Sequence, residues 1–141
     1  MEDALDSALS QAVAAVAAAR AAPLSVKKAW LAALLVDAAA DALFTARRGG
    51  QGEDILAFRA DLAAQCAALA LVFGVAGREC ELVTEAVEVP VRDYPNLGVE
   101  DFMVSLYNGR AVQRVRVVLT DGGRADVHEV LAEALEFLAT R

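Results

Sequence analysis

Alanine and leucine dominate the first third of the sequence, and this composition constrains the fold more than any other feature. Residues 4–22 and 25–48 contain neither proline nor glycine, and Pro23 lies between the two segments. Alanine and leucine are strong helix formers, so we predict one helix from Ala4 to Ala22 and a second from a cap at Ser25 to about Arg48. The short connection favours an antiparallel pair.

Helical periodicity predicts which residues of these two helices are buried. In the first helix the predicted apolar stripe is Leu5, Leu9, Ala12, Val13 and Val16. In the second helix it is Leu31, Leu34, Leu35, Ala38 and Ala42, widened by Trp30 and Phe44.

A third helix is predicted after a glycine-rich loop, Gly49 to Gly52. It opens at Glu53 and Asp54 and keeps a helical period through Ile55, Phe58, Leu62 and Cys66. The run 69–75 is continuously apolar and ends beside glycine. Both the end of the third helix and a buried strand fit this run, because periodicity alone does not separate them.

The amino-acid composition changes after about residue 67, where valine becomes frequent. We predict a strand from Leu82 to Val91, with Pro90 favouring the edge of a sheet, and a turn over 93–98. Segment 99–108 fits either a helix or the first strand of a hairpin turning at Asn108-Gly109. The alternation of 112–119 predicts a strand, and a turn at 121–123 follows.

The last helix has the clearest pattern. Asp126 and Glu129 have the spacing of a capping box. The apolar stripe that follows is Val127, Val130, Leu131, Ala134 and Leu138. We therefore predict an α+β fold: about three N-terminal antiparallel helices, then a small, mostly antiparallel sheet and a C-terminal amphipathic helix. One domain is expected over 1–141, helical over 1–66 and mixed over 67–141.

Charge and composition narrow the function. The net charge is −7 and the pI is about 4.6, which disfavours nucleic acid and anionic membranes as partners. The stretch nearest to a membrane span, Leu62 to Gly77, is better explained as buried core.

The N-terminus and the cysteines of the sequence bear on its location in the cell. The N-terminus is acidic, unlike a secretion signal, and Cys66 and Cys80 have no metal or redox spacing. We expect a cytoplasmic protein with reduced thiols and without a cofactor or bound metal.

Apolar residues are in excess, at 57% of the chain, against roughly 45–50% in typical soluble domains. A subunit interface is the natural place to bury the excess. Since the sequence has no nucleophile–base motif or phosphate-binding loop, we predict no catalytic residues. The leading hypothesis is a non-enzymatic protein-interaction or assembly module that acts as a homodimer, with a further protein partner allowed.

The alternative hypothesis is a small-molecule binding protein or enzyme with an anion site. Positive charge gathers late in the chain at Arg110, Arg114, Arg116 and Arg124, and guanidinium groups bind phosphate and carboxylate. The other candidate ligand-binding residues are His128, Tyr94, Tyr107 and Asn108. The competing structural explanation is that Arg114 and Arg116 pair with Glu85 or Glu88 across the sheet.

A weaker third hypothesis is a metal-dependent hydrolase built on acidic side chains. Asp37 and Asp41 lie four residues apart on one predicted helix, and Asp54 and Asp61 lie on the next. Two separated aspartates specify a divalent cation poorly. A solvated, charged helix face, with Arg59 or Arg48 able to pair with these acids, is the preferred explanation.

Overall fold

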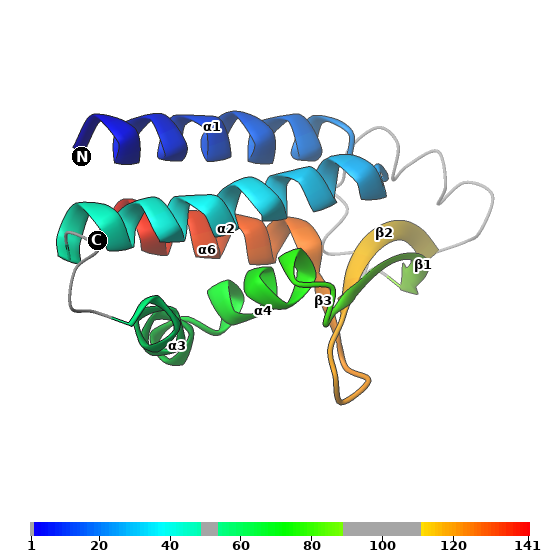
Figure 1. Cartoon of the computed structure of the whole chain (residues 1–141). Helices are drawn as coiled ribbons and strands as arrows, with labels where there is room; N and C mark the ends of the chain where they lie inside the picture. The colour runs from blue at the N-terminus through cyan, green and yellow to red at the C-terminus, as the bar shows by residue number, and fades with distance from the viewer. Residues whose placement is uncertain (1, 49–53, 89–110) are drawn as a thin grey trace.

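Two long antiparallel helices form one side of the molecule. The computed structural model describes residues 2–48, 54–88 and 111–141. Helix α1 spans Glu2–Ala21 and α2 spans Val26–Arg48, and they lie side by side in Figure 1. The Ser25 side chain accepts a hydrogen bond from the Lys28 amide at 3.1 Å, so the predicted cap of the second helix is confirmed.

The buried surface of α2 consists mainly of alanine, which corrects part of the predicted stripe. The buried α2 residues are Ala29, Ala32, Ala33, Val36, Ala39, Ala40, Leu43 and Phe44. Leu31 is instead 43% exposed, Leu34 is half-buried and Ala38 is exposed. The burial of Phe44 is confirmed, and Trp30, Leu35 and Ala42 are half-buried and pack against the core.

In α1 the predicted stripe is only partly right. Leu5 and Ala12 are buried, and Ala19 extends the same face. Leu9 and Val16 are half-buried and pack against the core. Val13 is 53% exposed, so its predicted burial is wrong. It lies toward the edge of the stripe, where no other described element covers it.

Two shorter helices follow, α3 (Ile55–Gln65) and α4 (Ala67–Ala76). Asp54 caps α3 by accepting the Leu56 amide at 2.9 Å. Cys66 has an extended backbone, with φ of −139°, so it separates two helices rather than lying inside the third. Segment 67–75 is therefore a separate helix, neither a strand nor a continuation of α3.

Within the described residues, the sheet has three antiparallel strands in the order β1-β2-β3. They are β1 (Glu81–Glu88), β2 (Ala111–Val118) and β3 (Arg124–Asp126). The first two match the predicted strands, and β1 is at an edge, as expected. The predicted turn at 121–123 joins β2 to β3, and Gly122 has a φ of +88°, a conformation that favours glycine. The short strand β3 was not predicted.

Helix α6 (Val127–Ala139) completes the core. Asp126 accepts the His128 and Glu129 amides, both at 3.1 Å, and all five residues of the predicted stripe are buried. Figure 1 shows α1, α2, α6 and α4 lying along one another, with the sheet at one end and both termini at the other. Val115 and Val117 of β2 join this same core.

The predicted α+β class is confirmed, with N-terminal helices, a small antiparallel sheet and a C-terminal helix. The change from helices to strands comes at Glu81 rather than near residue 67, because α4 occupies the intervening segment. The predictions for loop 49–52, Pro90, turn 93–98 and segment 99–108 lie outside the described residues.

Helix α2 also contains a stretch, Val26–Arg47, that is long and apolar enough to cross a membrane by length and composition. It differs from the segment that the sequence pointed to, Leu62 to Gly77. In this fold α2 is the central helix and contacts α1, α3, α4, α6 and β1. The central helix of a folded core can be as long and as apolar as a helix that spans a membrane, so this composition does not distinguish the two.

Candidate functional site

One face of the sheet carries a group of charged side chains. The strand register places Glu85 opposite Arg114, and Arg116 opposite Asp126. Residues opposite one another in an antiparallel pair point to the same side. The Glu85 carboxylate accepts a hydrogen bond from Arg124 Nε at 3.4 Å and lies 3.9 Å from Arg116 Nη1. The Glu85 carboxylate therefore pairs with both Arg116 and Arg124. The pair of Glu85 with Arg116 confirms part of the expected cross-strand pairing.

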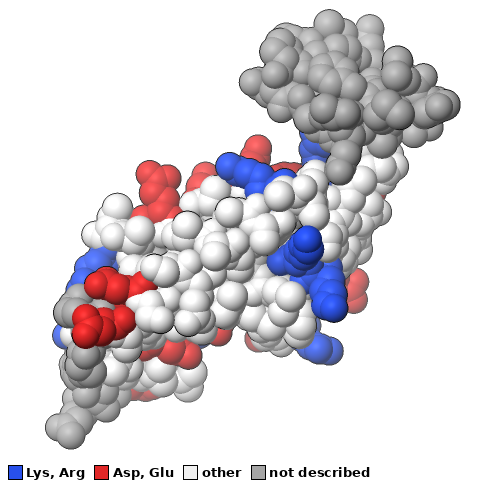
Figure 2. Space-filling view, turned by 90° about the horizontal axis from the view of Figure 1, so that it is seen from above, with Lys and Arg blue, Asp and Glu red and all other residues white. Residues whose placement is uncertain are grey.

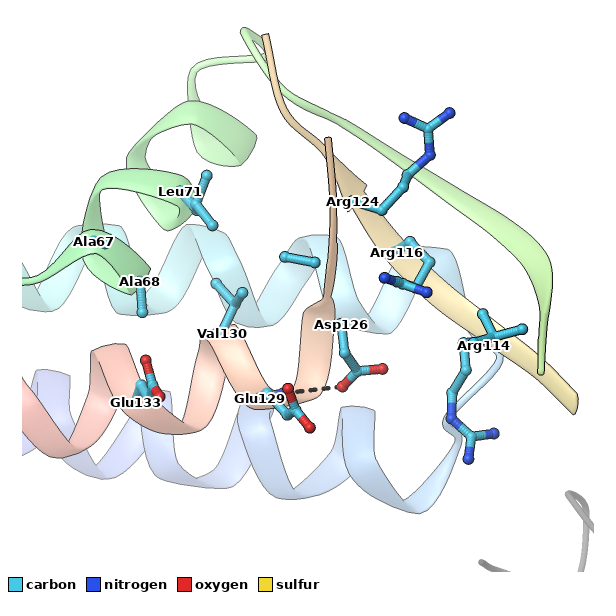
Figure 3. Close-up of a pocket in the computed structure, with 12 residues that line it drawn as sticks. Ala67, Ala68, Leu71, Arg114, Arg116, Arg124, Asp126, Glu129, Val130 and Glu133 are labelled. Carbon is cyan, nitrogen blue, oxygen red and sulfur yellow. Dashed lines mark hydrogen bonds between the residues drawn. The ribbon is translucent and has the colours of Figure 1, made fainter. Parts of the chain in front are cut away.

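This charged face forms one wall of a cavity of about 620 Å³, which we call the sheet–α6 pocket (Figure 3). The first half of α4 forms another part of the lining, through Ala67, Ala68 and Leu71. Helix α6 forms the opposite wall with Glu129, Val130 and Glu133. The sheet contributes Arg114, Arg116, Arg124 and Asp126 to the lining, and α6 contributes two glutamates.

Arg116 is more enclosed than Arg124, whose side chain is 40% exposed. The Arg116 side chain is 20% exposed, and its Nε is buried without a hydrogen-bond partner in the described part of the chain. Figure 3 shows its guanidinium directed to the α6 side of the sheet, while Arg124 extends away from the α6 glutamates. A buried N–H without a partner is costly, so an added acceptor that reached this group would stabilise it.

The sequence-based site is only partly assembled. Arg114 and Arg116 line the pocket together with Arg124, whereas His128 is absent from its lining. Tyr94, Tyr107, Asn108 and Arg110 lie outside the described residues. Glu129 and Glu133 were missed as site residues, although their spacing of four placed them on one polar face of the last helix.

His128 has a structural position instead. Its Nε2 lies 3.0 Å from the Pro23 carbonyl oxygen, so the imidazole joins the start of α6 to the α1–α2 turn. Since a carbonyl can only accept, Nε2 is the donor. The other ring nitrogen, Nδ1, is buried and has no hydrogen-bond partner among the residues described. No nucleophile is among these contacts.

The paired aspartates of α2 bind an arginine. Arg59 of α3 donates one hydrogen bond to Asp37 and another, of 2.8 Å, to Asp41. Burial opposes the charged form of Arg59, but the hydrogen bonds and charges of Asp37 and Asp41 outweigh it and raise its pKa. The Arg59 guanidinium also lies 4.0 Å from the ring centroid of Phe73. This contact links α3 to α4 as well as α2.

The four-aspartate metal hypothesis receives no geometric support. Asp37 and Asp41 hold Arg59, Asp54 caps α3, and Asp61 accepts a hydrogen bond from Gln65 at 3.1 Å. Across residues 2–48, 54–88 and 111–141, no three His, Cys, Asp or Glu side chains gather as a metal-binding group. A guanidinium occupies the place where the acidic pair would hold a cation.

A second surface feature is apolar. The outer side of the helix pair has a groove of about 410 Å³ lined almost wholly by apolar atoms, which we call the α1–α2 face. Ala15 and Ala18 line it from α1, and Lys28, Leu31, Leu34 and Leu35 line it from α2. Figure 2, a view from the α1 side, shows a broad uncharged area across the middle of the molecule. Leu31 and Leu34, which were predicted to be buried, contribute to this face, and Leu35 lines it while also packing against the core.

Both cysteines are free thiols and half-buried. Burial, and then the charge of Glu79, raises the pKa of the Cys80 thiol. A raised pKa disfavours the reactive thiolate. Cys80 therefore has the environment of a packing residue, and it contacts Gly74 of α4.

Comparison with known proteins gives no family for this chain. No protein-family model matches it, and neither a curated protein nor a solved structure is significantly similar.

Proposed function

We propose that the protein is a non-enzymatic assembly module that works as a homodimer through its α1–α2 face. The observation that carries this proposal is the inverted burial of α2. Its alanines face the core, while Leu31, Leu34 and Leu35 line an outward groove. A contiguous apolar surface of this kind is typical of a binding interface.

The dimensions of the face suit a second copy of the chain. Helices of 20 and 23 residues are about 30 Å long, and two such helices side by side present a footprint of roughly 600 Å². A stable dimer buries about 800 Å² on each partner. The α1–α2 face with its rim approaches this size.

The charges at the two ends of the helix pair favour a two-fold antiparallel arrangement. Asp3 and Asp6 lie near the start of α1, whereas Lys27 and Lys28 lie at the opposite end, near the start of α2. Figure 2 shows charges of both signs at each end of the uncharged area, so the proposed pairing is specifically between Asp3 and Asp6 of one copy and Lys27 and Lys28 of the other. A two-fold axis across the helices superimposes unlike ends and brings opposite charges together.

A pair of leucine substitutions tests the proposal. We expect Leu31→Glu to weaken the dimer at least about a hundredfold, because a carboxylate would be buried in the interface. Leu56→Glu is the matched control, since Leu56 is 72% exposed and lies on α3, away from this face. Sedimentation over a range of concentrations measures both dissociation constants. Equal dissociation constants for both variants and the wild type would contradict the assignment of this face.

A further inference from the structure

We propose that the sheet–α6 pocket binds a small zwitterion, an amino-acid-like molecule with a carboxylate at one end and an ammonium group at the other. This inference is independent of the dimer, because the pocket residues belong to the sheet, α4 and α6. It adds a ligand site to a chain otherwise proposed to be an assembly module. The argument rests on one incompletely satisfied guanidinium, Arg116, and two exposed carboxylates, Glu129 and Glu133, that line the same cavity of about 620 Å³.

The sheet wall supplies the carboxylate end of the site. Arg116 contributes a buried Nε that has no hydrogen-bond partner within the described residues. Its contact with Glu85 is a long one, 3.9 Å, and Glu85 is shared with Arg124. A ligand carboxylate accepting from Arg116 would satisfy the buried N–H by a charge-assisted hydrogen bond.

Helix α4 supplies an apolar part of the lining between the charged groups. Ala67, Ala68 and Leu71 line the cavity, and in Figure 3 Ala67 and Ala68 lie on the side of Val130 and Glu133 rather than beside Arg116. An apolar lining of this kind suits the alkyl chain that separates the carboxylate of the ligand from its ammonium group.

The α6 wall supplies the ammonium end. Glu129 and Glu133 are successive lining residues on one face of α6 and are exposed. Asp126, which also lines the pocket, is already engaged as the N-cap of α6. A simple anion such as phosphate would approach the arginines but would be repelled by the two glutamates. A zwitterion satisfies both walls, and the cavity volume lies in the range of small-molecule sites.

Three probes that differ only in charge test this assignment: δ-aminovalerate, valerate and pentylamine. Heteronuclear NMR follows the Arg116 Nε–H resonance directly at constant ionic strength. We expect δ-aminovalerate to shift this resonance saturably at concentrations of about 10 mM or less. Valerate should bind about tenfold more weakly, and pentylamine should not shift the resonance. No shift with any probe, or equal affinity for valerate and δ-aminovalerate, would overturn the proposal.

Variants of the two walls complete the test. Arg116→Gln should abolish probe-dependent thermal stabilisation, and the paired change Glu129→Gln with Glu133→Gln should reduce δ-aminovalerate affinity to that of valerate. Arg20→Gln and Glu136→Gln are matched controls, because both residues are exposed and neither lines the pocket. Zwitterion binding that survives in the wall variants as in the controls would refute the assignment. The wild-type probe comparison remains decisive if a wall variant fails to fold.

Discussion

The imidazole Nε2 of His128 lies 3.0 Å from the carbonyl oxygen of Pro23, a residue 105 positions earlier in the chain. This contact joins the N-terminus of α6 to the turn between α1 and α2. It therefore couples the helix pair that presents the α1–α2 face to the helix that forms one wall of the sheet–α6 pocket.

Removal of this hydrogen bond should destabilise the fold. We expect His128→Ala to lower the free energy of unfolding by about 1–2 kcal/mol, from the lost bond and the lost packing of a half-buried ring. His128→Gln should recover part of the loss, because the glutamine amide can occupy the Nε2 position. His128→Asn should not, because its amide reaches only the Nδ1 position. Urea unfolding measures all three, and equal stabilities for Gln and Asn would show that the Pro23 contact contributes nothing.

The contacts of Arg59 with Asp37, Asp41 and Phe73 should anchor α3 to the rest of the fold. We call these four residues the Arg59 cluster. Arg59→Met removes two charge-assisted hydrogen bonds and leaves Asp37 half-buried without its guanidinium. The expected loss of unfolding free energy is roughly 2 kcal/mol. Asp37→Asn should cost more than Asp41→Asn, because the Asp37 side chain is 23% exposed and the Asp41 side chain 49%. The opposite order in chemical denaturation would contradict this account of the cluster.

Gly74 and Cys80 should be energetically coupled. A Cβ at position 74 would lie 2.7 Å from the Cys80 sulfur, which is well inside van der Waals contact. We expect Gly74→Ala to destabilise the wild type by about 1–3 kcal/mol, although alanine is the better helix former. In a Cys80→Ala background the same change should be neutral or stabilising. A double-mutant cycle measures the coupling, and additive effects would mean that α4 moves to make room.

The N-cap of α6 should contribute to the stability of the fold. Asp126→Ala should cost about 1 kcal/mol, since Asp126 accepts two amide hydrogen bonds at the start of the helix. Asp126→Asn should keep most of this stability because asparagine is also a good cap. Thermal unfolding compares the two. If Asp126→Ala proved as stable as the wild type, the last helix would not depend on its cap.

Local sequence patterns accounted for the elements whose stabilising groups are neighbours in the chain. The cap and apolar stripe of α6 were predictable because Asp126 and the residues that follow it act within a few turns. The alternating strand β2 was predictable for the same reason. Strand β3 was missed because three residues carry no periodic pattern, and it exists only through its pairing with Arg116, Val117 and Val118.

The orientation of α2 depended on tertiary packing, and periodicity gave only part of its buried surface. Ranking by hydrophobicity placed Leu31 and Leu34 inside, but the buried residues include the smaller Ala29, Ala32 and Ala33, because α2 packs against five other elements. The pocket depended on long-range geometry in the same way. Arg116 and Glu133 belong to different elements, and only the packing of the sheet beside α6 makes them walls of one cavity.

The most direct test of the proposed two-fold antiparallel dimer is a charge-exchange experiment read by light scattering after gel filtration. One variant combines Asp3→Lys with Asp6→Lys, and the other combines Lys27→Glu with Lys28→Glu. Each variant alone would place like charges together at both ends of the interface, whereas a mixture would restore unlike pairs.

The account predicts that each variant alone elutes with the 14.8 kDa mass of one chain, and that the equimolar mixture and the wild type elute with about twice that mass. A mixture that stays at the mass of one chain, or variants that dimerise alone as well as the wild type does, would contradict it.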